Sequence, residues 1–286
     1  MTSAPAPGST VLVTGASSGI GLATAVAAAQ AGFRVAATVR DLARATALVD
    51  AAAGAGVEVD VRTLDVTDAE SVRACVAGVV DSYGRLDALV NNAGAAHVST
   101  LELDTLEAVR ATLEVNFFGV VAMSKEAMAH LRESGGRLIT VSSVGGVVGQ
   151  PFNEAYCAAK FAVEGYMEGL APVAATVGVR VSVVEPGAVA SSFVANAGLD
   201  RDAMLAAAGP YAPAMAGYLA RTAGAFANAQ TSQGAAEVVV RTLLADHPAF
   251  RVQTSEAARS FVGVKLGDLD GSKVQAVTGA WVASAS

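Results

Sequence analysis

The fold is decided by the stretch Thr14-Gly15-Ala16-Ser17-Ser18-Gly19-Ile20-Gly21, which joins an apolar strand to a helix. The strand residues Val11-Leu12-Val13 come before it, and an Ala-rich helical stretch follows through Ala31. Glycines in such a turn let the backbone approach a pyrophosphate closely, and the positive end of the next helix attracts the same anion. The spacing is G-x-x-x-G-x-G rather than G-x-G-x-x-G. A plain strand-to-helix turn is the alternative, which the surrounding strand and helix disfavour.

Further apolar, strand-like runs alternate with helical stretches along the chain. They are predicted at Arg34–Val39, Val57–Leu64, Leu86–Val90, Arg137–Val141 and Val179–Val184. Strands rich in Val, Ile and Leu that are joined by helices indicate a parallel sheet with helices on both faces. We therefore predict a single-domain, Rossmann-like, doubly wound α/β fold over residues 10–286, after a flexible tail at residues 1–9. Ligands bind such sheets at the carboxyl ends of the strands.

Composition excludes several classes of protein. The chain has 286 residues, of which 53% are apolar and 16% charged, so it is not a disordered protein. Its net charge of -7 lacks the basic footprint of a nucleic-acid binder. No uninterrupted apolar run reaches the roughly 18 residues of a membrane span. The two cysteines, Cys75 and Cys157, are too few for a disulfide framework and favour a cytoplasmic location; no metal site is expected.

Cofactor preference is predicted from the end of the second strand. An acidic residue about 20 positions beyond the glycines would bind a ribose 2′-hydroxyl, whereas a basic residue would accommodate a 2′-phosphate. Val39 stands at that position and Arg40 follows, while Ser17 offers a hydroxyl in the glycine loop. The sequence therefore favours NADP(H), with NAD(H) as the alternative. Arg40 could instead be a solvated strand end, and Asp41 could offset its charge or cap the next helix.

Four later segments carry a further signal. They are Leu64-Asp65-Val66, Asn91-Asn92-Ala93-Gly94, Tyr156-Cys157-Ala158-Ala159-Lys160 and Pro186-Gly187-Ala188-Val189. In order and spacing they resemble the short-chain dehydrogenase/reductase family, which has an Asp after its third strand followed by N-N-A-G, Y-x-x-x-K and P-G-x-V. The segments 35–42, 144–165 and 251–281 are similar to the subgroup of 17β-hydroxysteroid dehydrogenase type 1 and the retinol dehydrogenases.

The resemblance implies a catalytic set and a cofactor site. The implied catalytic residues are Asn116, Ser143, Tyr156 and Lys160, with Ser142 as the alternative to Ser143. The implied cofactor-binding residues are Gly15, Ser17, Ser18, Gly19, Ile20, Gly21, Arg40, Asp65, Val66, Asn92, Ala93, Gly94, Tyr156, Lys160, Pro186, Gly187, Val189 and Ser191. The subgroup resembles an NADP(H)-preferring one, with an Arg and a Ser at the places of Arg40 and Ser17.

The substrate is predicted less narrowly than the chemistry. The steroid enzyme of the subgroup has a His in its substrate loop, whereas this sequence has no His between His130 and His247. The resemblance therefore implies interconversion of an apolar ketone and a secondary alcohol, with a steroid as only one candidate. A dinucleotide-binding sensor without catalytic activity is the alternative from a different class.

The chemistry of the residues agrees with the implied roles. A tyrosine has an ordinary pKa of about 10, and a nearby lysine ammonium lowers it by favouring the phenolate. Tyr156 and Lys160 are four residues apart, which places them on one face of a helix. Ser143 would stabilise the charge that develops on the substrate oxygen. From the resemblance alone, Asn116 is expected to hold a water that links Lys160 to solvent.

The segment Ser191–Gln233 is predicted to be a substrate loop. It has no strand pattern and little charge, yet it contains Phe193, Met204, Tyr211, Met215, Tyr218 and Phe226. We expect it to cover the nicotinamide end, to move as a lid and to favour bulky apolar carbonyls. Packing as ordinary short helices is the alternative.

Three features remain. His97 could line the substrate mouth, and Cys157 is interpreted as small core packing rather than as a reactive thiol. The stretches 104–132 and 153–177 resemble helices that pair in dimers of the family. We therefore expect a homodimer or homotetramer.

Overall fold

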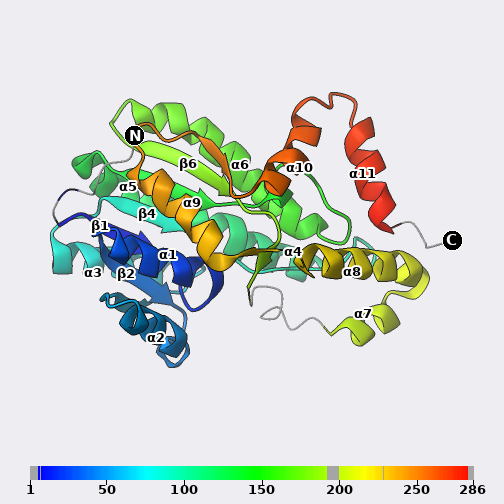
Figure 1. The fold of residues 1–286 in the computed structure, drawn as a ribbon, viewed down its shortest axis with the longest axis horizontal. Helices are drawn as coiled ribbons and strands as arrows, with labels where there is room; N and C mark the ends of the chain where they lie inside the picture. The colour runs from blue at the N-terminus through cyan, green and yellow to red at the C-terminus, as the bar shows by residue number, and fades with distance from the viewer. Residues whose placement is uncertain (1–5, 7, 192–199, 228, 283–286) are drawn as a thin grey trace.

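A seven-stranded parallel sheet forms the centre of the computed structural model, which describes residue 6 and residues 8–191, 200–227 and 229–282. The strand order is β3-β2-β1-β4-β5-β6-β9 (Figure 1). The strands are β1 Thr10–Val13, β2 Arg34–Val39, β3 Asp60–Thr63, β4 Ala88–Asn91, β5 Arg137–Val141, β6 Arg180–Glu185 and β9 Arg251–Gln253. The order reverses between β1 and β4, as in a doubly wound sheet, so the predicted fold class is confirmed.

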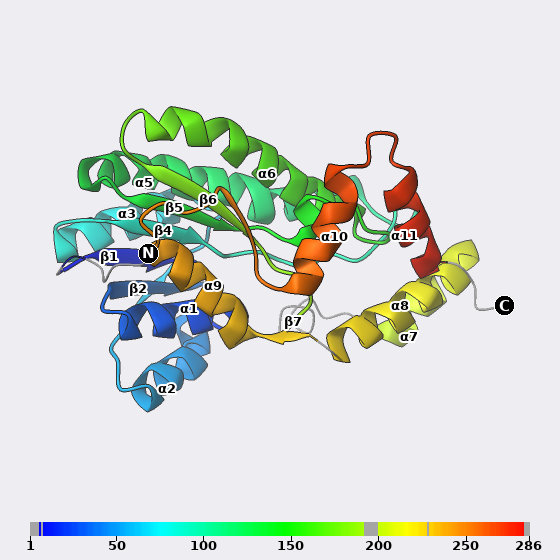
Figure 2. The ribbon, with the colours of Figure 1, turned by 45° about the horizontal axis from the view of Figure 1, so that its top comes forward.

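Helices cover both faces of the sheet (Figures 1 and 2). One face carries α1 Gly19–Gln30, α2 Thr46–Gly54 and α9 Ser232–Leu244. The other carries α3 Ala69–Tyr83, α5 Gly119–Ser134 and α6 Glu154–Ala175. This layering follows from the βαβ order of the sequence, since each crossover helix must bury its apolar face against the sheet.

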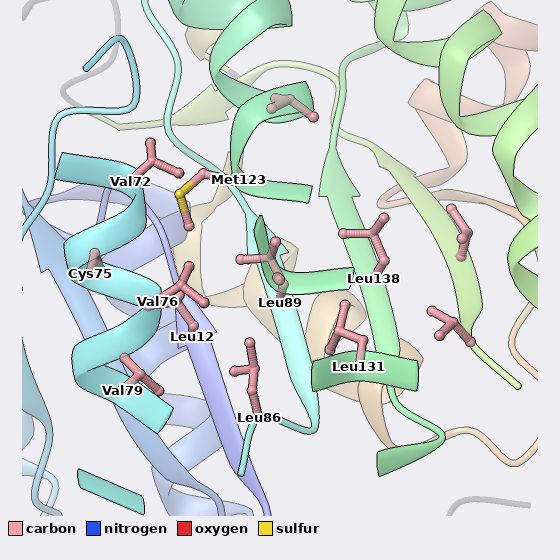
Figure 3. Close-up of a cluster of buried hydrophobic side chains, with 14 of the residues drawn as sticks. Leu12, Val72, Cys75, Val76, Val79, Leu86, Leu89, Met123, Leu131 and Leu138 are labelled. Atoms are coloured by element: carbon pink, nitrogen blue, oxygen red, sulfur yellow. The ribbon is translucent and has the colours of Figure 1, made fainter. Parts of the chain in front are cut away.

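Alternation along the strands builds a separate core on each face. Leu12, Leu89 and Leu138 point to the layer of α3, α5 and α6, where Figure 3 shows them in one cluster with Met123. Their strand neighbours, among them Val13, join the opposite core under α1 and α9. Burial of one such leucine contributes roughly 1.5–3 kcal/mol, so these two cores fix the register of the sheet.

The remaining elements lie mainly at the carboxyl edge of the sheet. They are η1 Leu42–Arg44, α4 Leu106–Leu113, η2 Glu114–Phe118, η3 Val144–Gly146, β7 Val189–Ala190, α7 Arg201–Ala207, η5 Gly209–Tyr211, α8 Ala212–Ala227, β8 Gln230–Thr231, α10 Glu256–Leu266 and α11 Ser272–Val282. The η2 segment is a π-helix. Figure 2 shows α8, α10 and α11 gathered at one end of the molecule.

Several predicted boundaries were wrong. The third strand begins at Asp60 rather than Val57, the fourth at Ala88 rather than Leu86, and the sixth ends at Glu185. β9, which the sequence did not predict as a strand, pairs with β6. At the start of the chain, Ser9 is buried and its carbonyl accepts a hydrogen bond from the Arg34 N–H.

The predicted substrate loop is largely helical. α7, η5 and α8 span most of residues 201–227, and β8 pairs with β7, so the alternative of short helices is correct for the described part. Met204, Tyr211, Met215 and Tyr218 form one apolar cluster with Phe152. Residues 192–199 and 228, and with them Phe193, lie outside the described residues.

Within the described ranges, no helix is both long and apolar enough to cross a membrane.

Candidate active site

A cleft of about 910 Å³ opens along the carboxyl edge of the sheet. Every residue that was predicted to bind the cofactor lines it, and Ser191 lies next to the glycine loop, because a Cβ on Gly19 would be 3.2 Å from the Ser191 Cβ. Ser143, Tyr156 and Lys160 line it as well. The cleft therefore brings together segments that are more than 170 residues apart in sequence, between Gly15 and Ser191.

The glycine loop is shaped so that only glycines fit. Gly15 has φ +68°, and a Cβ on it would lie 2.8 Å from the Ala93 Cα. A Cβ on Gly21 would lie 2.3 Å from both the Asn92 Nδ2 and the Gly15 carbonyl oxygen. Because α1 begins at Gly19, with Ser18 as its N-cap, the free N–H groups of a 12-residue helix stand at the loop. This cradle fits a pyrophosphate.

Thr14 ties the glycine loop to the end of β4. Its hydroxyl accepts hydrogen bonds from the N–H groups of Asn92 and Ala93, both at 2.9 Å. The Asn92 side-chain amide donates in return to the carbonyls of Thr14 and Gly15, at 2.9 and 3.0 Å. The N-N-A-G segment thus holds the loop in place at the point where the strand order reverses.

Charged residues gather where β2 and β3 end. Arg40 and Arg44 are exposed and line the cleft. The Asp41 carboxylate accepts from the Ala43 N–H, so this residue is the N-cap of η1, as one of the two alternatives held. Hydrogen bonds from the Thr67 backbone and hydroxyl hold the pKa of Asp65 below its ordinary value, and the charge of Arg40 adds to this effect. Two arginines and two aspartates therefore stand at this end, and neighbouring backbone N–H groups hold both carboxylates in place.

Ser143 and Tyr156 meet at the middle of the cleft. Ser143 follows β5 and caps η3, where its Oγ accepts from the Gly145 N–H at 3.0 Å. Burial raises the pKa of Tyr156 to about 12, and a hydrogen bond between the Tyr156 and Ser143 side chains works against that rise. Ser142, the alternative to Ser143, has its Oγ on the other side, against Gly146 and the Glu164 side chain.

Lys160 lies one helical turn beyond Tyr156 on α6. Its side chain is buried, its Nζ donates to the Val141 carbonyl at 3.1 Å, and the Nζ lies 5.9 Å from the centre of the Tyr156 ring. Burial lowers the pKa of Lys160 to about 8, while the negative charge of Glu164 opposes that fall. The Lys160 ammonium therefore lies close enough to Tyr156 to act on it. Its pKa of about 8 also means that it begins to lose its proton just above neutral pH.

Asn116 is fully buried in the π-helix η2 and does not itself line the cleft. Its side-chain amide donates to the carbonyls of Ala95 and Thr112, both at 3.0 Å, and its Oδ1 accepts from the Ala95 N–H. A Cβ on Gly94 would lie 2.9 Å from the Asn116 Oδ1 and 3.8 Å from the Lys160 Nζ. Asn116 and Lys160 therefore share one neighbourhood behind the cleft, and π-helical turns are frequent at functional sites.

A cluster of buried charged side chains links α6 to β6 and β9. The Arg251 Nε lies 3.2 Å from the Glu164 Oε2 and 3.5 Å from the Glu185 Oε1, and both carboxylates are almost fully buried. Burial raises the pKa of Glu164 and of Glu185 above the ordinary value. Together with Lys160, these buried side chains carry two positive and two negative charges when all four are ionised, and Glu168 also contacts Arg251 from the surface at 2.8 Å.

The expectations for His97 and Cys157 have different outcomes. The His97 Nε2 lies 2.8 Å from the Asp104 Oδ2, and His97 is not among the residues that line the cleft. Cys157 is buried and burial raises its pKa to about 11, which agrees with a packing role because a thiol with a raised pKa is unreactive.

Sequence reasoning missed part of the cleft wall. Beyond the predicted residues, the wall includes Thr38, Arg44, Asn153, Leu219, Arg221, Thr222, Ser255, Phe261 and Trp281. Arg44 had a signal, since it lies four residues after Arg40 and adds a second cation. The aromatic residues of α10 and α11 had none, because only the folded chain brings them to the cleft.

A dinucleotide cradle beside a Ser, Tyr and Lys on a doubly wound sheet defines an oxidoreductase site. Residues 9–202 match the family model of the short chain dehydrogenases. The chain is 37% identical over 270 residues to "17-beta-hydroxysteroid dehydrogenase type 1" of Mus musculus, which covers 92% of this chain and 78% of that protein. It is 36% identical over 278 residues to "Retinol dehydrogenase 8" of Bos taurus, covering 92% and 86%. The chain therefore belongs to the short-chain dehydrogenase/reductase family and is an oxidoreductase acting on CH-OH groups.

Other comparisons agree. A shorter match, 44% identical over 190 residues, covers 64% of this chain and 55% of "Estradiol 17-beta-dehydrogenase 1" of Rattus norvegicus. Among solved structures, a short-chain dehydrogenase from Streptomyces avermitilis has a TM-score of 0.75 and 30% identity, and the match covers 95% of this chain and 97% of that one. These results confirm the resemblance to the subgroup of hydroxysteroid and retinol dehydrogenases.

Proposed function

We propose that the chain is an NADP(H)-dependent oxidoreductase that interconverts an apolar ketone, steroid-like ketones included, and its secondary alcohol. One observation carries the proposal: the side chains of Ser143 and Tyr156 are hydrogen-bonded to each other beside a buried Lys160, in the same cleft as the glycine cradle. The dehydrogenase names of the relatives support the reaction class.

Ser143 and Tyr156 act directly on the substrate carbonyl. When bound, the reduced nicotinamide supplies the hydride for the carbonyl carbon. Ser143 donates a hydrogen bond to the carbonyl oxygen and stabilises the negative charge that develops there. Tyr156 gives that oxygen its proton, and the same group removes the proton in the oxidation direction.

Lys160 makes this proton transfer feasible near neutral pH. Burial alone raises the pKa of Tyr156 to about 12, so its phenolate needs a nearby positive charge. The Lys160 ammonium lies on the same helix face and provides that charge. Asn116 holds the backbone at Ala95 and, with a water, connects Lys160 to solvent so that Tyr156 regains its proton.

Arg40 binds the 2′-phosphate of NADP(H), with Arg44 beside it. Both side chains line the adenine end of the cleft, and the carboxylate of Asp41 is occupied by its hydrogen bond to the Ala43 N–H. A charge-assisted contact between a guanidinium and a phosphate is stronger than a neutral hydrogen bond. NAD(H) lacks the group that these arginines would bind.

Arg40→Ala is expected to weaken NADPH binding by about tenfold or more and to leave NADH binding nearly unchanged, because only NADPH loses a charge-assisted contact of about 1.5–3 kcal/mol. Calorimetric titration of both cofactors gives the two Kd values. Arg241→Ala is the matched control, since Arg241 is exposed on α9 and does not line the cleft. Equal Kd values for NADPH and NADH in the parent protein would favour the NAD(H) alternative.

Reduction is expected to slow as pH rises through about 8. A buried lysine loses its proton at a lower pH than a solvated one, and its charge is then missing when Tyr156 gives up its proton. Tyr156 itself stays protonated over this range, since its pKa is raised. The measurement is kcat/KM for a ketone at saturating NADPH, from about pH 6 to about pH 10. A rate that increases through this range would contradict the assignment of Lys160.

A homo-oligomer, a homodimer or homotetramer, is part of the proposal. α4 and η2 pack against α6, and these three segments expose the apolar side chains of Leu106, Phe118, Phe161 and Tyr166. Large exposed apolar patches mark interaction surfaces.

We also propose a cytoplasmic location, supported by the two cysteines, Cys75 and Cys157, which are both free and buried.

The direct test is oxidation of NADPH by a panel of apolar ketones, with small polar ketones for comparison. We expect turnover with the apolar ketones. A protein that binds NADPH and reduces none of them would instead fit the alternative of a dinucleotide-binding sensor.

A further inference from the structure

The cleft continues past Tyr156 into an apolar chamber at the end formed by α8, α10 and α11. Figure 2 shows these three helices side by side, away from α1 and α2. The described side chains that wall this part are mostly apolar: Val98, Val144, Tyr218, Leu219, Phe226, Phe261 and Trp281. An apolar part of the substrate fits such a wall.

Arg221 is the exception to the apolar character of this chamber. The described charged residues that line the whole cleft are Arg40, Arg44, Asp65, Lys160 and Arg221. Arg40, Arg44 and Asp65 follow β2 and β3 at one edge of the sheet, whereas α10 and α11 follow β9 at the other. Lys160 lies next to Tyr156, before the chamber begins. Among the described residues, Arg221 is therefore the charged residue that lines the chamber.

Arg221 is held by an aromatic stack rather than by a carboxylate. Its guanidinium carbon lies 4.4 Å from the centre of the Trp281 ring, and the Phe261 ring stacks on Trp281 at 5.6 Å with an interplanar angle of 25°. No carboxylate in the described parts of the chain lies within ion-pair distance of Arg221. A guanidinium that stacks on an indole keeps its N–H edge available for hydrogen bonds.

We propose that the natural substrate is an apolar ketone or alcohol that carries a carboxylate at the end remote from the reacting carbon, and that Arg221 binds this carboxylate. The inference rests on the proposed function and specifies its substrate class. In a protein with a net charge of -7, an anionic substrate needs a local cation. A planar carboxylate matches the fork of one guanidinium and balances its single charge, whereas a phosphate dianion would leave one negative charge unpaired.

The experiment compares keto acids with their methyl esters. A series of straight-chain keto acids varies the distance between the ketone and the carboxylate, and each ester removes only the charge. With NADPH saturating, the acid is expected to exceed its ester in kcat/KM by about tenfold at the best chain length. Arg221→Gln is expected to bring this acid-to-ester ratio close to one.

Arg201→Gln is the matched control, because Arg201 is exposed on α7 in the same segment and does not line the cleft. It should keep the acid-to-ester ratio of the parent protein. If acids and esters are reduced equally well by the parent, or if Arg221→Gln keeps the preference for the acid, this inference is wrong while the proposed function stands. If the parent reduces ketones of the apolar panel but neither these acids nor their esters, the inference is wrong while the proposed function stands. If the parent reduces no ketone at all, the proposed function fails and the inference with it.

Discussion

Replacing Tyr156 with Phe is expected to lower ketone turnover by about 10²–10⁴-fold, the range that a positioned proton donor contributes. The ring stays in the cleft wall and only the hydroxyl is lost, so the fold and cofactor affinity should be retained. Because Ser143 keeps its own hydrogen bond from the Gly145 N–H, the variant does not release η3. Single-turnover kinetics with NADPH bound separates the chemical step from binding.

The control for this prediction is Tyr166→Phe, a second tyrosine on α6 that is partly exposed and lies outside the cleft. It should keep the turnover of the parent protein. The NADPH Kd of Tyr156→Phe should remain within about threefold of the parent value, because the substitution removes no charged group. Loss of a charge-assisted contact would weaken binding by far more. Turnover near the parent rate in Tyr156→Phe would reject the proton-donor role.

Arg251→Ala is expected to reduce the free energy of unfolding by about 3 kcal/mol. Its guanidinium is the cation that contacts both Glu164 and Glu185, whose side chains are 4% and 0% exposed. Removing it leaves two buried carboxylates near each other without compensation. Urea unfolding at neutral pH measures the loss.

The pH dependence of this loss has a definite sign. The pKa values of Glu164 and Glu185 are already raised in the folded protein, and loss of Arg251 raises them further. Protonation then removes the repulsion, so the difference in the free energy of unfolding between Arg251→Ala and the parent should shrink as the pH falls toward about 5.

A second substitution tests the same cluster. Glu164→Gln added to Arg251→Ala should recover part of the stability. Glu168→Gln is the control, because that carboxylate is 59% exposed and its pair with Arg251 contributes at most about 1 kcal/mol. A loss that is equally large for Glu168→Gln would contradict the account.

Much of the fold could be predicted because most of its strands are apolar runs that alternate with helical stretches. Each of the predicted strand runs corresponds to a strand of the sheet, with β2 and β5 at their predicted bounds and the ends of the others shifted by a few residues. β9 could not be predicted, since it has three residues and all of them are only partly buried. Its strand conformation depends on pairing with β6, which is a tertiary contact and leaves no local pattern.

The segment after β6 was harder to predict for another reason. Its apolar residues fit a flexible apolar loop as well as they fit short helices, and the choice depends on what they pack against. In the structure, Met215 and Tyr218 pack on Phe152, which lies just before α6. That contact favours helix α8, and the lid motion expected of this segment stays a prediction.

The candidate site also has a part that the sequence predicts and a part that depends on tertiary contacts. The glycine loop and the Tyr156 and Lys160 pair are local motifs, so their place at the cleft follows from the order of strands. Arg251 and Trp281 are far from these motifs in sequence and reach them only through β9 and the helices after it. Charge clusters and aromatic stacks of this kind become visible when the chain is folded.

Transfer of deuterium from NADPH that carries deuterium in place of both C4 hydrogens of the nicotinamide tests the central claim most directly. The protein is incubated with the labelled cofactor and the best ketone of the panel, and the alcohol is analysed by mass spectrometry. The account predicts that the alcohol carries the deuterium on its carbinol carbon and that Tyr156→Phe forms it far more slowly. An alcohol without deuterium, or one formed equally fast by Tyr156→Phe, would contradict hydride transfer coupled to a proton from Tyr156.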